Sequence, residues 1–147
     1  SSRAARDAFI NEPSIGDVLK QAANADIAIV GIGSKRSSST MDLLQSAGLP
    51  DETYDALVHE MAGDMAARIY DIEGKPLDHG WSDRIIGVDL EQMHRIPYVI
   101  GIAAGAGKAT GVIGAVRGGY VSEIVLSSSC ALAILRYLDA EAGVKAS

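Results

Sequence analysis

Glycines and a lysine follow an apolar stretch late in the chain, in the order common at phosphate-binding turns. The stretch reads YVIGIAAGAGK from Tyr98 to Lys108, and the small residues after it are typical of a helix. Gly105 and Gly107 would leave backbone amides at the start of that helix free to bind an anion, which the helix dipole also attracts. Lys108 would add a positive charge. The pattern predicts an anion site; the alternative is a solvated lysine after a tight turn.

Two other stretches carry polar groups suited to the same ligand. The stretch GIGSKRSSST offers backbone amides, hydroxyls and two cations, and its candidate ligand-binding residues are Gly31, Gly33, Ser34, Lys35, Arg36 and Thr40. Asp64 follows a glycine, and its carboxylate could accept hydrogen bonds from sugar hydroxyls. A phosphate-binding turn beside such an acid predicts a sugar-phosphate site. Taken singly, each glycine could serve only a tight turn, the two cations could be solvated, and Asp64 could cap a turn.

The two common nucleotide-binding motifs fail when their positions are counted. The Walker pattern requires a glycine where Ile102 stands and a serine or threonine where Ala109 stands. The dinucleotide fingerprint requires a third glycine, but that position holds Thr110 in one loop and Arg36 in the other. We therefore expect neither an ATPase nor an NAD-binding protein, and no cofactor.

Metal binding and nucleophilic catalysis also lack support. His59, His79 and His94 are too far apart and too irregularly spaced to form a metal motif, and Gly63 stands where H-E-x-x-H requires its second histidine. Cys130 follows three serines with no evident base, which favours a small buried residue. We expect no metal ligands and no catalytic residues.

Composition limits the partners of the chain. Its 147 residues suffice for one domain with a real core. The formal net charge of -6 disfavours nucleic-acid binding by the chain itself, which needs a basic face, and it offers no basic patch to an anionic membrane. One cysteine allows no internal disulfide, and no apolar run approaches the roughly 20 residues of a membrane span. We expect a cytoplasmic protein.

Apolar runs and helical periodicity alternate along most of the chain. The patterns predict strands over 26–33, 64–70, 84–90, 97–105 and 122–128. They predict helices over 13–25, 40–48, 50–63, 90–96, 108–119 and 128–141. Alternation of this kind predicts an α/β fold with a mostly parallel sheet and helices on both faces. Ligands of such sheets bind beyond the carboxyl ends of the strands, where the candidate loops lie.

The order of these segments resembles the effector-binding domain of the SorC-type, or DeoR-like, bacterial transcriptional regulators. The resembling stretches are DIAIVGIGS, MAGDMAARIYDIEGKPL and the long run from RIIGVDLEQMHRIPYVIGIAAGAGK to SSSCALAIL. They follow the family's order and cover nearly the whole chain. The most specific parts are the pair Gly63–Asp64 and the segment AAGAGKATGVIGAVRGG.

The resemblance implies a fold, a ligand and partners. The fold is Rossmann-like and related to glucosamine-phosphate and ribose-phosphate isomerases. The ligand is a phosphorylated sugar effector without turnover, and its binding changes how an attached helix-turn-helix domain holds operator DNA. The family associates as dimers and tetramers. By position, Lys108 matches the family's phosphate lysine, Asp64 matches its sugar-binding acid, and the loop 34–40 approaches the ligand.

The chain departs from the family pattern in several places. The family's AGG before the lysine is AAGAGK here, and the usual TDE before the last helix is SSSC at 127–130. The helix-turn-helix domain and the first half of the effector domain are absent. Residues 1–147 are thus expected to be the C-terminal part of an effector domain, incomplete by itself, that buries an exposed sheet edge against another chain.

Two other functions remain open at this stage. The first is a sugar-phosphate isomerase of the related fold, in which Asp64 is the one base that can be assigned near the lysine loop. Interconversion of aldose and ketose phosphates would identify it. The second is a pure oligomerisation module, which predicts no anion binding.

Overall fold

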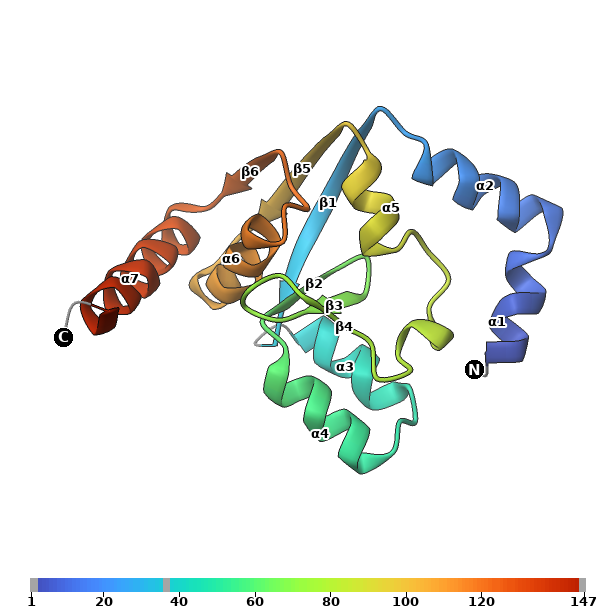
Figure 1. Cartoon of the computed structure of the whole chain (residues 1–147), viewed down its shortest axis with the longest axis horizontal. Coiled ribbons are helices and arrows are strands. Elements are labelled where there is room, and N and C mark those ends of the chain that lie inside the picture. The colour runs from blue at the N-terminus through green and yellow to red at the C-terminus, as the bar shows by residue number, and fades with distance from the viewer. Residues whose placement is uncertain (1–2, 36–37, 146–147) are drawn as a thin grey trace.

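A six-stranded mixed sheet organises the computed structural model, which describes residues 3–35 and 38–145 (Figure 1). The strands lie in the order β4-β3-β2-β1-β5-β6. Their bounds are β1 (Ile27–Ser34), β2 (Gly63–Met65), β3 (Arg68–Tyr70), β4 (Pro76–Leu77), β5 (Tyr98–Ala103) and β6 (Glu123–Leu126). Only β1, β5 and β6 run parallel, whereas β1 to β4 pair antiparallel in succession. The expectation of a mostly parallel sheet was wrong.

The antiparallel half arises from connections too short for a parallel crossover. Two residues, Ala66 and Ala67, join β2 to β3, and a parallel connection needs about a dozen residues or more. The segment expected as one strand is therefore a hairpin. The strand expected over 84–90 was also wrong. There the carbonyls of Gly87 and Val88 accept hydrogen bonds from the buried guanidinium of Arg68 (2.9 and 3.2 Å) instead of joining a strand ladder.

The helices follow the predicted segments with one addition, α1, which the sequence patterns did not predict. Their bounds are α1 (Arg3–Ile10), α2 (Pro13–Ala23), α3 (Ser38–Ser46), α4 (Asp51–Glu60), α5 (Leu90–Arg95), α6 (Ala109–Arg117) and α7 (Ser128–Lys145). Short 3-10 turns are η1 (Ser82–Arg84) and η2 (Ala106–Lys108). Within the described ranges, no helix is long and apolar enough to cross a bilayer.

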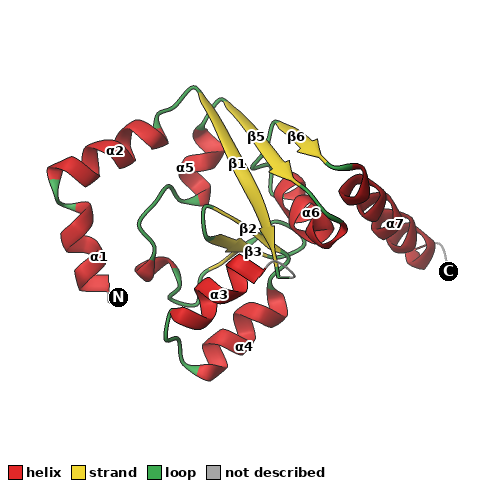
Figure 2. Cartoon of the chain, turned by 180° about the vertical axis from the view of Figure 1, so that it is seen from behind, coloured by secondary structure: helices red, strands yellow, loops and turns green. Residues whose placement is uncertain are grey.

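Two apolar clusters hold the sheet to its helices. The larger joins β1 and β5 to α5, α6 and the start of α7 through residues that include Ile32, Val99, Met93, Val112 and Cys130. The smaller packs α3 and α4 against the hairpin through Leu44, Leu57, Met61, Ile69 and Trp81. The helices of the parallel half therefore cover one face. The opposite face is open in this chain, so the expectation of helices on both faces was wrong for β1 and β5 (Figure 2).

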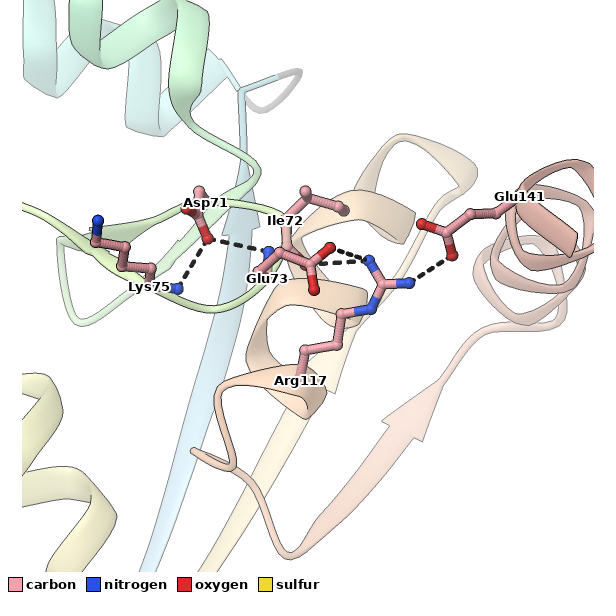
Figure 3. Close-up of polar contacts among 6 residues, drawn as sticks. All are labelled: Asp71, Ile72, Glu73, Lys75, Arg117 and Glu141. Carbon is pink, nitrogen blue, oxygen red and sulfur yellow. Dashed lines mark hydrogen bonds and ion pairs between the residues drawn. The ribbon is translucent and has the colours of Figure 1, made fainter. Parts of the chain in front are cut away.

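Arg117, at the end of α6, ties the hairpin to the last helix (Figure 3). Its guanidinium forms ion pairs with Glu73 in the turn after β3 (2.9 Å) and with Glu141 on α7 (2.5 Å). The hydrogen bond that Arg117 donates to the Glu141 carboxylate raises the pKa of Arg117, which keeps the guanidinium charged. In the same turn, the Asp71 carboxylate accepts hydrogen bonds from the backbone amides of Glu73 and Lys75. The network fixes α6 relative to both of its neighbours.

Two buried tyrosines connect α6 and the hairpin through hydrogen bonds. The Tyr70 hydroxyl donates to the Gly111 carbonyl (3.0 Å), and the Tyr120 hydroxyl donates to the Gly74 carbonyl (2.6 Å). Their ring centroids lie 5.7 Å apart. Burial raises the pKa of both phenols, and the charge of Asp64 raises that of Tyr70 further. The pair is therefore held in the protonated form.

Replacing Ala67 with glycine should stabilise the protein. Ala67 has φ of +61° in the β2–β3 turn, where a Cβ is unfavourable by about 1–2 kcal/mol. After the entropy cost of glycine, we expect Ala67→Gly to raise the free energy of unfolding by about 1 kcal/mol. Ala142→Gly, on an exposed position of α7, should lower it by about as much. Urea denaturation measures both, and destabilisation by Ala67→Gly would contradict the turn geometry.

Stability should fall in alkaline solution because of Tyr70. In the unfolded chain this phenol ionises near its ordinary pKa of about 10, whereas the folded state resists ionisation, so the unfolded state loses its proton first and stability falls above about pH 10. Tyr70→Phe should make that fall shallower, and should cost about 1 kcal/mol at neutral pH by leaving the Gly111 carbonyl without its donor.

Urea denaturation from neutral pH to about pH 11 tests the tyrosine prediction around the ordinary phenol pKa. The control is Tyr54→Phe, at a tyrosine on α4 outside the pair. It should keep the wild-type pH dependence. An equally steep alkaline loss in Tyr70→Phe would show that Tyr70 does not cause it.

Candidate functional site

Three chain segments meet at the carboxyl end of β1. The Ser34 hydroxyl donates a 2.7 Å hydrogen bond to the Gly107 carbonyl in η2. Ser34 also pairs with Gly63 at the start of β2. The Thr110 hydroxyl, in the first turn of α6, donates to the Ala62 carbonyl (3.0 Å) just before β2. The end of β1, the start of β2 and the turn into α6 thus form one polar region, to which three of the predicted stretches contribute.

Glycines allow these segments to approach at backbone distance. A Cβ added at Gly111 would lie 2.1 Å from the Gly33 carbonyl oxygen. A Cβ added at Gly63 would lie 2.4 Å from the Gly111 Cα and 2.7 Å from the Gly33 oxygen. All of these neighbours are backbone atoms, so no side chain can move aside. The contact of α6 with β1 and β2 therefore requires glycine at both positions, and sequence reasoning did not single out Gly111.

Lys108 occupies the junction between η2 and α6 and is half-buried. The turn before it depends on Gly105, whose φ of +97° favours glycine and whose carbonyl accepts the Lys108 amide (3.1 Å). Within the described residues, the Lys108 ammonium forms no ion pair. Its charge acts on Cys130: burial raises the pKa of that thiol, and the lysine partly opposes the rise. Lys108 therefore lies near the start of α7, and no carboxylate in the described part of the chain pairs with it.

The start of α7 adds hydroxyls that the sequence analysis did not assign to the site. The Ser127 hydroxyl accepts hydrogen bonds from the Gly105 amide (2.9 Å) and the Cys130 amide (3.3 Å), and it lies 3.1 Å from the Ser129 hydroxyl. The turn into α6 and the first turn of α7 are thus joined directly. Two helix N-termini beside a lysine favour an anion, because free amides and helix dipoles both attract negative charge.

Asp64 approaches this region from the other side. Its Cα pairs with Gly33 across the β1–β2 ladder, and its side chain is half-buried. Its charge helps to raise the pKa of Tyr70, after the larger effect of burial. The register places this side chain on the face of Gly33 and Ile69, at the end of β1. A site with a cation at one end and a carboxylate near the other can bind an anionic group and neighbouring hydroxyls.

Several of the predicted site residues lie outside this polar region. Gly31 lies in mid-strand on the open face of β1, opposite Ile102 of β5, with open space around it. It does not join the polar region. Lys35 is exposed in the turn after β1, and Thr40 falls within α3. Arg36 lies outside the described residues. The predicted residues that the structure gathers are Gly33, Ser34, Asp64, Gly105, Gly107 and Lys108.

A cavity of about 780 Å³ lies elsewhere, between the first two helices and α5. Its lining includes Arg6, Lys20, Arg68, Asp89 and Arg95, and none of the predicted site residues. The polar groups of the candidate site converge at the end of β1, away from this cavity. Across residues 3–35 and 38–145, no three histidine, cysteine or carboxylate side chains gather to hold a metal.

The sequence is similar to a sugar-binding domain family and to bacterial transcriptional regulators. A family model described as "Putative sugar-binding domain" matches residues 1–136. The sorbitol operon regulator of Klebsiella pneumoniae is 32% identical over 111 residues, which cover 76% of this chain and 35% of that protein. The transcriptional regulator LsrR of Escherichia coli is 32% identical over 128 residues, covering 86% of this chain and 40% of that protein. The chain thus spans well under half the length of these curated relatives.

Solved structures agree with the sequence relatives. The full-length sorbitol operon regulator SorC from Klebsiella pneumoniae superposes with a TM-score of 0.78 at 26% identity, over 91% of this chain and 44% of that chain. A domain from Vibrio fischeri, described as the "Putative Sugar-Binding Domain of Transcriptional Repressor", gives 0.80 at 27% identity, over 94% and 55% of the two chains. These relatives are transcriptional regulators rather than enzymes. The chain belongs to the sugar-binding domain family of SorC/DeoR-type transcriptional regulators.

Proposed function

We propose that this chain senses a phosphorylated sugar at the region formed by Ser34, Asp64 and Lys108. The observation that supports this best is the half-buried Lys108, without an ion-pair partner in the described chain, at a turn that joins two helix N-termini. A charge in that position is most stable when an anion shares it. Asp64, across the ladder from Gly33, gives the site an acceptor for sugar hydroxyls.

The two ends of the site have separate roles in this proposal. The amides of Gly105 and Lys108 already donate to Ser127 and to the Gly105 carbonyl. The phosphate therefore binds the amides of Ala106 and Gly107 and the lysine ammonium, and contributes most of the affinity through charge-assisted hydrogen bonds. The Asp64 carboxylate distinguishes sugars by the positions of their hydroxyls. Ser34 holds the Gly107 carbonyl, so it orients the turn rather than binding the phosphate itself.

Binding becomes regulation when the ligand prefers one of two conformations. In the proposed parent protein, a helix-turn-helix domain attached to this one holds operator DNA in the cytoplasm, and the protein associates as a dimer or tetramer. A ligand that binds one arrangement more tightly shifts operator affinity by its difference in binding free energy. The acidic chain described here contributes no DNA-binding surface of its own in this scheme.

Thermal unfolding of the full-length natural protein, titrated with sugar phosphates and the same sugars without phosphate, tests the proposal. At about 100 times its dissociation constant, the correct effector should stabilise the protein by roughly 2.7 kcal/mol. Lys108→Ala should abolish the shift. Lys75→Ala, which removes an exposed lysine outside the site, should retain it.

Three results would contradict the sensor proposal. Equal shifts with and without phosphate would exclude the phosphate contact, and an unchanged response in Lys108→Ala would exclude that lysine. Interconversion of aldose and ketose phosphates by the protein would instead identify an isomerase, for which Asp64 would be the base.

A further inference from the structure

The cavity between α1 and α2 on one side and α5 on the other is lined largely by polar and charged side chains (Figure 1). Its volume of about 780 Å³ is within the range of pockets that hold small molecules. The cations of the described chain that line it are Arg6, Lys20, Arg68 and Arg95. The carboxylates that line it are those of Glu12, Asp17 and Asp89. Such a lining favours a polar occupant, because an apolar one would bury charged groups without partners.

Arg68 of β3 is the most deeply buried cation in this lining. The residue is 5% exposed, and its Nε and Nη2 atoms donate to the carbonyls of Val88 and Gly87. Within the described residues, Nη1 has no hydrogen-bond partner, and no carboxylate lies at ion-pair distance from the guanidinium. No side-chain nitrogen in that part of the chain is both inaccessible and unpartnered, so Nη1 reaches open space beside Arg68. A buried guanidinium without a counterion is stabilised by an anion that shares its site.

Arg6 of α1 brings a second guanidinium to the same place. Its Nε atom donates to the Ile85 carbonyl (3.0 Å), close to the two carbonyls that Arg68 holds, and its side chain is half-buried. Burial lowers the pKa of Arg68, the charge of Asp89 opposes this effect, and the charge of Arg6 adds to it. The two guanidiniums therefore lie close enough to repel each other. An anion between them would offset that repulsion.

The other charges around the cavity have partners or are exposed. Lys20 pairs with Asp17 (3.6 Å), Arg95 pairs with Glu91 (3.0 Å), and one nitrogen of Arg6 pairs with the neighbouring Asp7 (3.0 Å). The Asp89 carboxylate accepts the Gln92 amide at the start of α5 (2.6 Å), and Glu12 is exposed. Positive charge without a partner is therefore concentrated at Arg68.

A second, smaller cavity beside Arg68 is less suited to an anion. Its volume is about 200 Å³, and its other charged side chains in the described chain are the carboxylates of Asp78, Asp89 and Glu91. These carboxylates repel an anion. Electrostatics therefore directs an anion to the larger cavity, which Arg6 and Arg68 both line.

We propose that the larger cavity binds the oxyanion group of a small molecule, a carboxylate or a phosphate, between the guanidiniums of Arg68 and Arg6. A planar guanidinium donates paired hydrogen bonds to either group. The exposed side chains of Lys20 and Arg95 attract the anion to the cavity. Because Arg6 lies on α1 and Arg68 on the hairpin strand β3, the bound anion ties these two elements together.

This site is separate from the region around Lys108. Ser34, Asp64 and Lys108 do not line the cavity, so the inference does not depend on the proposed function. A buried strand from another part of the protein is a poor alternative occupant. Such strands are apolar, and one placed here would separate the charged lining from water without supplying partners for it.

Isothermal titration calorimetry of the full-length natural protein, with inorganic phosphate and citrate as separate probes at constant ionic strength, tests this site. Arg6→Gln and Arg68→Gln each remove one guanidinium from the cavity. Lys108→Ala removes the cation of the other candidate anion site. Arg136→Gln, at an exposed arginine of α7 outside the cavity, is the matched control. Thermal unfolding without the probes confirms that each variant is folded.

At least one probe should bind saturably, and the probe that binds identifies the group as phosphate or carboxylate. Its affinity should fall roughly tenfold or more in Arg6→Gln and in Arg68→Gln, and should stay unchanged in Lys108→Ala and Arg136→Gln. Failure of both probes to bind saturably would overturn the proposal, as would unchanged affinity in Arg6→Gln, which leaves the Arg68 contacts intact even if Arg68→Gln does not fold. Loss of binding in Lys108→Ala would also overturn it, because the anion would then occupy the region around Lys108.

Discussion

The close backbone contact of α6 with the sheet is the constraint on which the rest of the structure depends. Gly33, Gly63 and Gly111 come from three different elements. A Cβ at Gly63 or at Gly111 would collide with backbone atoms, among them the Gly33 carbonyl oxygen. This contact brings the first turn of α6 to the carboxyl end of β1. Gly107 and Thr110, on either side of Lys108, reach the β1–β2 junction only because the helix axis lies this near to the strands.

Two further interactions hold α6 in that position. The Tyr70 hydroxyl binds the carbonyl of Gly111, the residue at the closest approach, and Arg117 ties the other end of the helix to the hairpin and to α7. The helix that presents the candidate lysine is therefore fixed at both ends. A site held this way is preorganised, so a ligand loses little affinity to ordering it.

Much of this arrangement could be predicted from the sequence. The continuous apolar runs of β1 and β5 and the caps of the later helices were sufficient to place those elements. The β2–β3 hairpin was not predicted, because its turn is Ala66–Ala67 and lacks the glycine or asparagine that marks such turns. The prediction of a mostly parallel sheet was wrong for the same reason, since the one extended segment that was expected forms two antiparallel strands.

For the candidate site, local motifs predicted the residue types, but contacts between distant parts of the chain determine which residues lie together. Gly31 and Gly33 occur in one short motif and, two residues apart, share one face of β1. Only Gly33 pairs with β2 and meets α6 through its carbonyl oxygen, whereas Gly31 pairs with Ile102 of β5. Ser127 joined the site because of a hydrogen bond between residues 22 positions apart, which no local pattern reveals. The residue types indicated binding of an anion and of hydroxyl groups. The register of the sheet determines which of those residues lie together.

Backbone amide NMR of the full-length natural protein, titrated with the effector sugar phosphate, tests the central claim most directly. The account predicts that the amides of Ser34, Asp64, Gly107 and Lys108 shift together and saturate at one dissociation constant, because the glycine contact makes them one site. Shifts confined to the cavity between α2 and α5, or amides at Asp64 and Lys108 that respond independently, would contradict it.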